Sequence, residues 1–246
     1  MQKFRLLKTG YNNAFMNMAI DEAILQSKVM PTIRLYGWKP SAVSIGYFQS
    51  LKEEVDLDKC KEYGVDFIRR VTGGGAVYHD KELTYSLIAQ ENFVSKDILE
   101  SYKQICNGII KGLEKINIRA QFAGINDIIT NGKKISGNAQ TRKQGMILQH
   151  GTIIMDVNAE KMFSILKVPD EKIKDKLIQN VKERVTSVKK LGKEVSFEEL
   201  SNKIADGFRE ALNVELVEQK LTKTELNLAK ELEKTKYKTK EWNFKR

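Results

Sequence analysis

The sequence predicts a single domain in which helices and strands are mixed, and three observations carry this prediction. Apolar residues recur at helical spacing in several segments, most clearly from Ile98 to Leu113. Short runs of β-type residues, such as Leu83 to Ala89, alternate with those segments. No stretch rich in Pro, Gly or Ser divides the chain. We therefore expect one domain that spans residues 1–246.

Composition limits the class of protein. Apolar residues make up 41% of the chain, which is ordinary for a globular core. No run is long enough to cross a membrane, and the first residues lack the apolar segment of a signal peptide, so we expect a cytoplasmic protein without a membrane partner. The only two cysteines, Cys60 and Cys106, fall in helical patterns. A disulfide framework or a zinc site is therefore not expected.

The net charge of +10 indicates acidic partners. The lysines, however, are spread along the chain and mixed with glutamates, and no basic stripe with interleaved aromatic residues is present. We therefore expect a solvated, lysine-rich surface and no nucleic acid partner. Such a surface suits electrostatic steering toward an acidic protein.

The first helix is predicted from about Asn13 to Ser27, because apolar residues recur there at helical spacing. Asn12 or Asn13 can cap its start. Asp21 and Glu22 lie off the apolar stripe, and this position favours solvated acids over a role in a site.

Two β-type runs follow, from Thr32 to Trp38 and from Ala42 to Ile45. The Lys39-Pro40-Ser41 turn between them predicts a hairpin. A short helix is expected from Asp56 to Tyr63, with Gly64 at its C-terminal cap.

The last part of the chain is predicted to be mostly helical, and it shows no pattern with an evident chemistry. The expected elements are a helix at Ala159–Leu166, a helix that starts at Pro169-Asp170-Glu171, an extended piece at Arg184–Val188, a helix at Ser196–Leu212, a strand at Val214–Val217 and a helix at Thr222–Thr235. The last two helices begin with capping boxes, Ser196 to Glu199 and Thr222 to Glu225. Trp242 is expected to pack back onto the domain.

A glycine-rich stretch, RRVTGGGAVYHD from Arg69 to Asp80, follows the predicted strand Val65–Ile68. Three consecutive glycines let the backbone approach a ligand closely, so their amides can face a phosphate or a carboxylate. The two arginines at its start add positive charge and paired donors. The stretch lacks the Lys-Ser/Thr of a Walker A loop and is not GxGxxG. A plain tight connection stays open as the alternative.

A second informative stretch lies between Gly124 and Met155. Asn131-Gly132 predicts a hairpin, because a type I′ turn needs positive φ at both positions. Lys134 follows, framed by Ile135 and Gly137, and a glycine in a strand often marks close approach by a ligand. A solvated edge lysine is the alternative.

Together these motifs resemble the lipoate-protein ligase A family, in the biotin/lipoate ligase group. The residues that carry the resemblance are RRVTGGGAVYHD and, in order after it, NDI, GKKISGNAQ and LQHGTI. The resemblance implies an α+β fold like that of class II synthetases, with a mixed central β-sheet flanked by helices. It also implies that lipoate and ATP, with Mg²⁺, form lipoyl-AMP, from which the lipoyl group passes to a lysine of an acceptor lipoyl domain. The implied acceptors are E2 subunits of 2-oxoacid dehydrogenases and the H protein of glycine cleavage.

Carried over position by position, the resemblance assigns roles to single residues. Lys134 is the implied catalytic residue. Nucleotide binding is implied at Arg70, Gly75, Ala76, Val77, Tyr78 and Lys134, and lipoate binding at Gly74, Gly75, His79, Lys134, Gly137 and His150. Asn126 and Gln49 are expected to support the site, and Asp127 is expected to help hold Mg²⁺.

Two departures from the family pattern keep alternatives open. Members that act alone carry a small C-terminal domain that is not expected here, so either a separate accessory chain completes the ligase or adenylation is impaired in isolation. The octanoyltransferase branch resembles this sequence as closely, but it uses a cysteine near the hairpin, and Phe122–Asp127 contains no thiol. The ATP-dependent ligase is therefore the main prediction, and a transferase acting from acyl carrier protein or another lipoylated protein is the alternative. A lipoate carrier without activity and a nucleic-acid binder rank lower.

Overall fold

The computed structural model describes residues 1–28, 30–167 and 174–246, and its strands form two sheets. The large mixed sheet has eight strands in the order β11-β1-β2-β6-β10-β9-β8-β7, and the small sheet has the order β4-β3-β5. The strands are β1 Gln2–Asn12, β2 Thr32–Trp38, β3 Ala42–Ile45, β4 Asp66–Arg69, β5 Val77–His79, β6 Glu82–Gln90, β7 Gln121–Ala123, β8 Asp127–Thr130, β9 Lys133–Lys143, β10 Met146–Ile154 and β11 Val214–Gln219.

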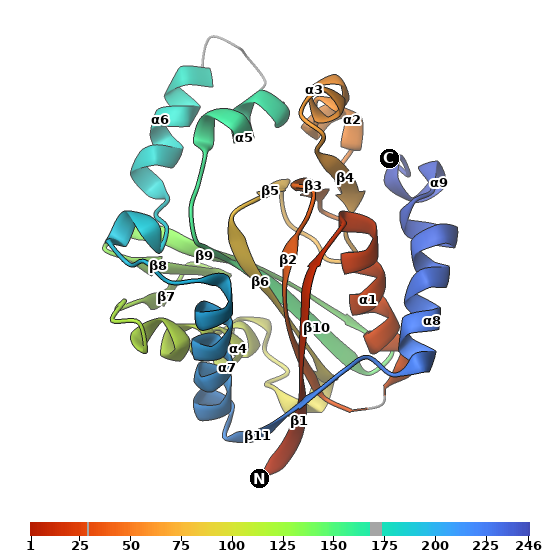
Figure 1. Cartoon of the computed structure of the whole chain (residues 1–246), viewed down its shortest axis with the longest axis vertical. Coiled ribbons are helices and arrows are strands. Elements are labelled where there is room, and N and C mark those ends of the chain that lie inside the picture. The colour runs from red at the N-terminus through yellow and green to blue at the C-terminus, as the bar shows by residue number, and fades with distance from the viewer. Residues whose placement is uncertain (29, 168–173) are drawn as a thin grey trace.

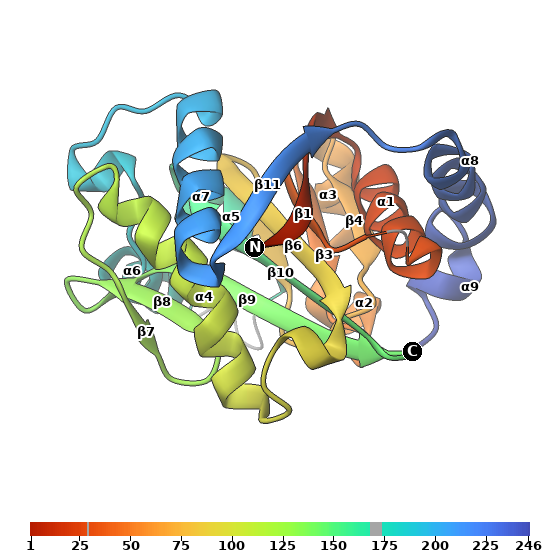
Figure 2. The same cartoon turned by 90° about the horizontal axis from the view of Figure 1, so that it is seen from below.

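Helices cover both faces of the large sheet. They are α1 Ala14–Ser27, α2 Leu51–Glu54, α3 Leu57–Glu62, α4 Ile98–Glu114, α5 Ala159–Ile165, α6 Lys174–Arg184, α7 Phe197–Leu212, α8 Lys223–Leu232 and α9 Lys240–Asn243. Short 3₁₀ turns lie at Glu91–Phe93 and Lys189–Leu191, and a π-helical turn lies at Glu233–Tyr237. Helices α4 and α7 pack together on one side of the sheet and α1 and α8 on the other (Figures 1 and 2).

The apolar core is divided among these layers. One cluster fills the space between the large sheet and α4 with α7, and includes Leu87, Ile109 and Phe208. A second lies under α1 and α8, and a third joins the small sheet to α2, α3 and α5. Central strands of the large sheet are therefore covered on both faces. Successive residues of β2 and of most of β6 are buried, and buried and exposed residues do not alternate along them.

Most elements lie where periodicity and capping signals predict them. Helix α4 covers the clearest apolar stripe, and Asp97 caps it by accepting from the Glu100 amide. The turn at Asn131-Gly132 joins β8 and β9, and both residues have positive φ. The two runs on either side of Gln149-His150-Gly151 form a single strand, β10. The helix start predicted at Pro169-Asp170-Glu171 lies outside the described residues.

The hairpin predicted at Lys39-Pro40-Ser41 is wrong. Strand β2 pairs with β1 and β6 in the large sheet, whereas β3 pairs with β4 and β5 in the small one. The turn therefore passes the chain from one sheet to the other. This crossing places the small sheet next to α1, near the upper ends of β2 and β6 in Figure 1.

The prediction that Asp21 and Glu22 are solvated is also wrong. Helix α1 is covered by the large sheet on one side and by α8 and the π-helical turn on the other, so both acids are buried. Arg34 Nη1 donates to Asp21 Oδ1 at 2.6 Å. Glu22 accepts from Lys236 Nζ at 2.7 Å and from the hydroxyl of Tyr237. The partner of Asp21 lies on β2 of the large sheet, whereas the partners of Glu22 lie more than 200 residues along the chain.

A buried ion pair joins the two ends of the chain. The Arg5 guanidinium donates to both carboxylate oxygens of Glu225, at 2.8 and 2.6 Å. Glu225 also accepts from the Thr222 amide in the predicted capping box of α8. Burial alone would raise the pKa of Glu225, but these hydrogen bonds and the Arg5 charge lower it to about 2.

This pair predicts a pH dependence of stability. Because the folded pKa of Glu225 lies below its ordinary value of 4.5, folding stability from this group is present above that value. It is lost as the pH falls toward about 2. We expect urea titrations to give a lower free energy of unfolding for Glu225→Gln than for wild type at neutral pH. Between pH 4.5 and about pH 2, we expect this free energy to change less with pH in the variant than in wild type. Equal slopes in the two proteins would contradict the assignment.

In the described part of the chain, no helix combines the length and the apolar character needed to cross a membrane.

Candidate functional site

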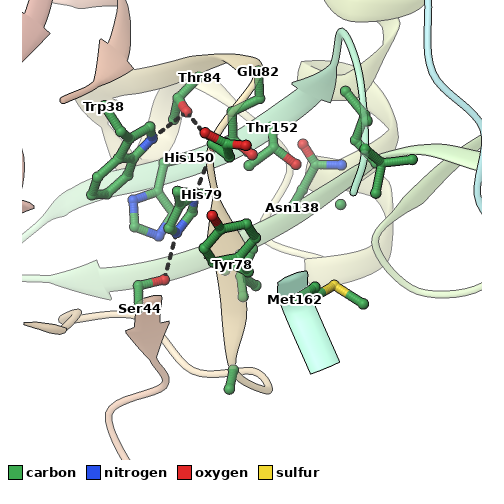
Figure 3. Close-up of a pocket in the computed structure, with 18 of the residues that line it drawn as sticks. Trp38, Ser44, Tyr78, His79, Glu82, Thr84, Asn138, His150, Thr152 and Met162 are labelled. Carbon is green, nitrogen blue, oxygen red and sulfur yellow. Dashed lines mark hydrogen bonds and ion pairs between the residues drawn. The ribbon is translucent and has the colours of Figure 1, made fainter. Parts of the chain in front are cut away.

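A pocket of about 350 Å³ lies on the α1 face of the large sheet, between that sheet, the small sheet and the α5–α6 region. The glycine-rich loop, strands β6, β9 and β10, and one end of α1 contribute to its wall. Apolar side chains cover much of the wall, among them Met18, Val77, Ile154, Met162 and Val181. Polar side chains gather in the same pocket, as Figure 3 shows for His79, Glu82, Asn138 and His150.

Arg70 braces the glycine-rich loop from inside. Its guanidinium donates to the carbonyls of Gly73 and Gly75 at 2.7 Å each, and to the carbonyl and hydroxyl of Ser44 at 3.0 and 3.1 Å. Gly74 has a φ of +93°, and a Cβ there would lie 2.9 Å from Arg70 Nη2, so glycine is required. Burial lowers the pKa of Arg70 to about 10, which leaves it charged at neutral pH.

The Arg69 guanidinium, like that of Arg70, donates its hydrogen bonds to the protein and not to a bound anion. Its guanidinium donates to the carbonyls of Tyr47 and Gln49, at 2.8 and 2.6 Å, and to those of Trp242 and Asn243, each at 3.0 Å. The arginine pair thus holds the loop and the C-terminal segment in place. Trp242 packs back on the domain as predicted, because its indole N–H donates to the Arg69 carbonyl.

His79 is the centre of a hydrogen-bonded row in the pocket. Its Nδ1 lies 2.6 Å from Glu82 Oε1, and its Nε2 lies 2.7 Å from Ser44 Oγ. Thr84 Oγ1 donates to the same Glu82 oxygen at 2.9 Å and accepts from Trp38 Nε1 at 2.8 Å. The Trp38 ring stacks on the imidazole with centroids 4.0 Å apart (Figure 3).

His150, on β10, is the second histidine in the pocket. Its Nε2 lies 2.7 Å from Thr72 Oγ1, and its Nδ1 lies 3.7 Å from Asp21 Oδ2. Burial lowers the pKa of His150, and the nearby Asp21 carboxylate opposes that shift only in part. The imidazole is therefore neutral at physiological pH.

Lys134, on β9, brings an ammonium group to the pocket. Its Nζ lies 2.7 Å from Asp127 Oδ1, and the lysine side chain is 39% exposed. Its carbonyl accepts from the Thr186 amide, which ties the segment after α6 to β9. A Cβ at Gly137 would lie 2.8 Å from Lys134 Cε and Nζ, so the end of the lysine side chain occupies the space that a side chain at position 137 would need.

This contact predicts the effect of Gly137→Ala. The flexible end of Lys134 must move away from the new methyl group, while the backbone, which has no unusual φ at Gly137, stays in place. We expect the variant to keep its thermal unfolding midpoint within a few degrees. We expect its enzymatic activity to fall about tenfold or more, because Lys134 is the predicted catalytic residue and small misplacements of such a group are costly. An unchanged rate would show that the lysine position is not critical.

The pocket brings together most of the residues named from the sequence. It is lined by Arg70, Gly74, Gly75, Ala76, Val77, Tyr78, His79, Asn126, Lys134, Gly137 and His150. Gln49 and Asp127 are not among the lining residues. The Gln49 side chain instead accepts from the Gly46 amide at 2.9 Å and closes that turn. The individual roles assigned to these residues stay predictions.

The Mg²⁺ role predicted for Asp127 stays a prediction. The carboxylate already holds the Lys134 ammonium at 2.7 Å. Among the residues that the structure describes, no group of three or more His, Cys, Asp or Glu side chains is arranged to hold a metal ion.

The two thiols lie outside the pocket lining. Cys60 and Cys106 are both buried, and burial raises the pKa of each to about 12. Cys106 lies on α4 in the core between that helix and the large sheet, and the side-chain amide of Gln149 on β10 contacts its sulfur. Both residues are core residues, as their helical patterns predict.

Sequence reasoning missed Ser44, Glu82 and Trp38 as site residues. All three precede or follow recognised motifs but carry no motif of their own. Alternation along β3 was the one available signal, because it places Ser44 on the face opposite to Val43 and Ile45.

Comparison with known proteins places this geometry in a family. The model of the lipoyl protein ligase A/B catalytic domain matches residues 13–209. Octanoyltransferase LipM of Geobacillus kaustophilus is 38% identical, over 99% of this chain and 98% of its own. Octanoyltransferase LipM of Clostridioides difficile is also 38% identical, over 100% of both chains.

Solved structures show the same architecture. A chain from a structural study of a bi-partite lipoate protein ligase and its E2 lipoyl domain from Thermoplasma acidophilum has a TM-score of 0.90 and 36% identity, covering 99% of this chain and 96% of that chain. Lipoate-protein ligase A bound with ATP has a TM-score of 0.85 and 33% identity, with 99% of each chain covered. Biotin protein ligase from Aquifex aeolicus, at 14% identity over 87% of this chain and 71% of that chain, has a TM-score of 0.51, a likeness of fold alone. The predicted α+β fold of the class II synthetase type is confirmed.

The predicted main activity, ATP-dependent activation of lipoate, is contradicted by the relatives. Relatives by sequence that are 34% to 38% identical over 99% to 100% of this chain are named octanoyltransferases, which was the alternative held at the sequence level. The solved structures with similar coverage are named lipoate protein ligases. Lipoylation chemistry is common to both groups of relatives, and the ATP and the lipoyl domain belong to individual structural neighbours. The match over most of the chain and the end-to-end relatives lead to one conclusion: this chain belongs to the lipoyl protein ligase A/B catalytic domain family.

Proposed function

We propose that this chain is an acyltransferase. It moves an octanoyl group, or the related lipoyl group, from a thioester on a carrier protein to a lysine of an acceptor lipoyl domain. E2 subunits of 2-oxoacid dehydrogenases and the glycine cleavage H protein are the proposed acceptors. The end-to-end relatives named octanoyltransferase support this reaction over the other activities of the family.

The observation that carries the proposal is the division of the pocket into an apolar wall and a polar group of side chains. Met18, Val77 and Met162 can receive an acyl chain, and each buried methylene contributes about 0.8 kcal/mol. Lys134 and the two histidines supply the polar groups in the same pocket. An acyl chain with a reactive carbonyl at one end requires this combination.

The proposed chemistry needs a group that stabilises negative charge at the carbonyl. When a nucleophile attacks a thioester, charge grows on the carbonyl oxygen, and a fixed cation stabilises that state more than the ground state. Lys134 is the proposed cation, held by Asp127 and by its contact with Gly137. The thioester is already activated, so this reaction consumes no nucleotide.

The test compares two donors with one lipoyl-domain acceptor. The first mixture contains octanoyl-acyl carrier protein and no nucleotide, and the second contains lipoate, ATP and Mg²⁺. We expect intact-mass measurements to show octanoylated acceptor in the first mixture, and none with an acceptor whose target lysine is replaced by arginine. Acceptor modified only in the second mixture would overturn the proposal. Repeating both with a candidate accessory chain tests whether one is needed, which stays a prediction.

A further inference from the structure

Ser44, His79 and Glu82 are arranged as a nucleophile, a base and an orienting acid. The hydroxyl lies 2.7 Å from His79 Nε2, and His79 Nδ1 lies 2.6 Å from Glu82 Oε1. All three side chains are more than nine-tenths buried, yet all three line the pocket. Figure 3 shows the three in one row beside the pocket. These distances match those between the members of a serine-based catalytic triad.

The surrounding hydrogen bonds set the proton positions in this row. Thr84 Oγ1 receives the Trp38 indole N–H, so its own hydrogen points to Glu82 Oε1. Glu82 is therefore an acceptor, and His79 Nδ1–H donates to it. That leaves His79 Nε2 as an acceptor for the Ser44 hydroxyl hydrogen. The imidazole is held in the tautomer that a general base requires, and the stacked Trp38 ring fixes its orientation.

The backbone directs Ser44 into the pocket. In β3, Val43 and Ile45 pack into the cluster with α2 and α3, so the side chain between them points to the opposite face. Arg70 Nη1 donates to Ser44 Oγ at 3.1 Å. A guanidinium at this distance stabilises an alkoxide relative to the hydroxyl, which makes the oxygen a better nucleophile.

We propose that Ser44 accepts the acyl group covalently, a proposal that rests on the thioester-to-lysine transfer proposed above. Ser44 Oγ attacks the thioester carbonyl while its proton passes to His79 Nε2. The C–S bond then breaks, and His79 returns that proton to the departing thiolate, which leaves as a thiol. An ester joins the acyl group to Ser44.

The second half returns the enzyme to its starting state. The neutral amine of the acceptor lysine attacks the ester carbonyl, and His79 takes a proton from the nitrogen. The C–Oγ bond breaks, an amide forms, and Ser44 Oγ regains the proton from His79. No oxidant or nucleotide is needed, and each bond formed is matched by one broken.

The other candidate nucleophiles fit less well. Cys60 and Cys106 are buried outside the pocket lining, and burial raises the pKa of both thiols to about 12. Thr72 contacts His150 but is not among the pocket-lining residues, and the 3.7 Å from His150 to Asp21 exceeds a hydrogen bond. Among these four residues, only Ser44 both lines the pocket and is hydrogen-bonded to a histidine that is itself hydrogen-bonded to a carboxylate.

The test is a search for the acyl-enzyme by mass spectrometry. The full chain is mixed with octanoyl-acyl carrier protein without acceptor, quenched in acid and analysed by intact mass and by peptide mapping. We expect one octanoyl group on the peptide that contains Ser44. Ser44→Ala should lose this adduct and should slow transfer to a lipoyl domain by up to about a millionfold, the loss seen when a triad serine is removed. Ser201→Ala, which removes a buried hydroxyl on α7, should retain both properties.

A second variant separates chemistry from folding. Ser44→Cys should form an adduct that neutral hydroxylamine releases, as expected for a thioester, whereas the wild-type ester should resist this treatment. No adduct on wild type, an adduct on another residue, or full activity in Ser44→Ala would overturn the inference. Transfer without an adduct would sink the covalent step and leave the proposed function standing. An adduct without transfer to the lipoyl domain would support the covalent step and overturn the proposed function.

Discussion

Lys134→Ala is expected to lower the rate of octanoyl transfer by about a hundredfold to a thousandfold, the usual loss when one fixed donor to a developing oxyanion is removed. The ammonium is held by Asp127 at 2.7 Å and lies across Gly137, so it does not have to reorganise during the reaction. Single-turnover rates with octanoyl-acyl carrier protein and a lipoyl domain measure the effect. Octanoate binding should weaken much less than the rate falls, because the charge is needed mainly in the transition state.

The matched control is Lys133→Ala, which removes an exposed lysine next to it on β9. This neighbour is not among the pocket-lining residues, so its loss should leave the rate within about twofold. The same loss of rate in both variants would point to general surface charge instead of a placed cation. Neither variant should unfold, because a partly exposed ion pair contributes about 1 kcal/mol or less.

Arg34→Leu is expected to lower the free energy of unfolding by about 3–5 kcal/mol, because it leaves the Asp21 carboxylate buried without its main partner. The Arg34 guanidinium also donates to the Asn17 carbonyl and side-chain oxygen, at 2.9 and 2.6 Å. Burial disfavours the charged form of Asp21, but the Arg34 charge holds the pKa of Asp21 below its ordinary value. Urea unfolding at neutral pH measures the change.

Two further variants test the cause. Arg34→Leu combined with Asp21→Leu removes both charges and should recover part of the lost stability. Arg209→Leu breaks an exposed pair with Asp206, at 2.7 Å, and should cost less than about 1 kcal/mol. A loss of that small size in Arg34→Leu would contradict the predicted cost of leaving the Asp21 carboxylate buried without its partner.

Local signals carried much of the fold prediction. The Asn131-Gly132 turn and the caps of α7 and α8 depend on a few neighbouring residues, and each is found where predicted. Helix α4 has one buried face, so its period is easy to detect. In contrast, β2 and β6 are buried on both faces, so composition and turn signals were the only guide to them.

The errors share a different cause, which is contact between distant parts of the chain. Asp21 and Glu22 look solvated on a helical wheel. No local pattern indicates that Asp21 faces Arg34 on the large sheet, or that the segment with Lys236 and Tyr237 covers Glu22. The Lys39-Pro40-Ser41 turn gives a reversal but not the sheet that the next strand joins. Sheet assignment depends on tertiary packing, which overrides a turn signal.

The candidate site was predicted in the same uneven way. The glycine-rich loop and Lys134 carry recognisable patterns, and the structure brings them to one pocket. Ser44 and Glu82 are ordinary strand residues whose chemistry depends on the strands that lie beside them. No local pattern indicates their partnership with His79, because residues 44, 79 and 82 come from three different strands.

The position of β1 has a consequence for the order of folding. This strand is held between β2 on one side and β11 on the other. In the described part of the chain, the Arg5 side chain on β1 forms its ion pair with Glu225. The edge of the sheet at β1 therefore stays open, and Arg5 lacks this partner, until residues 214–225 have folded onto it.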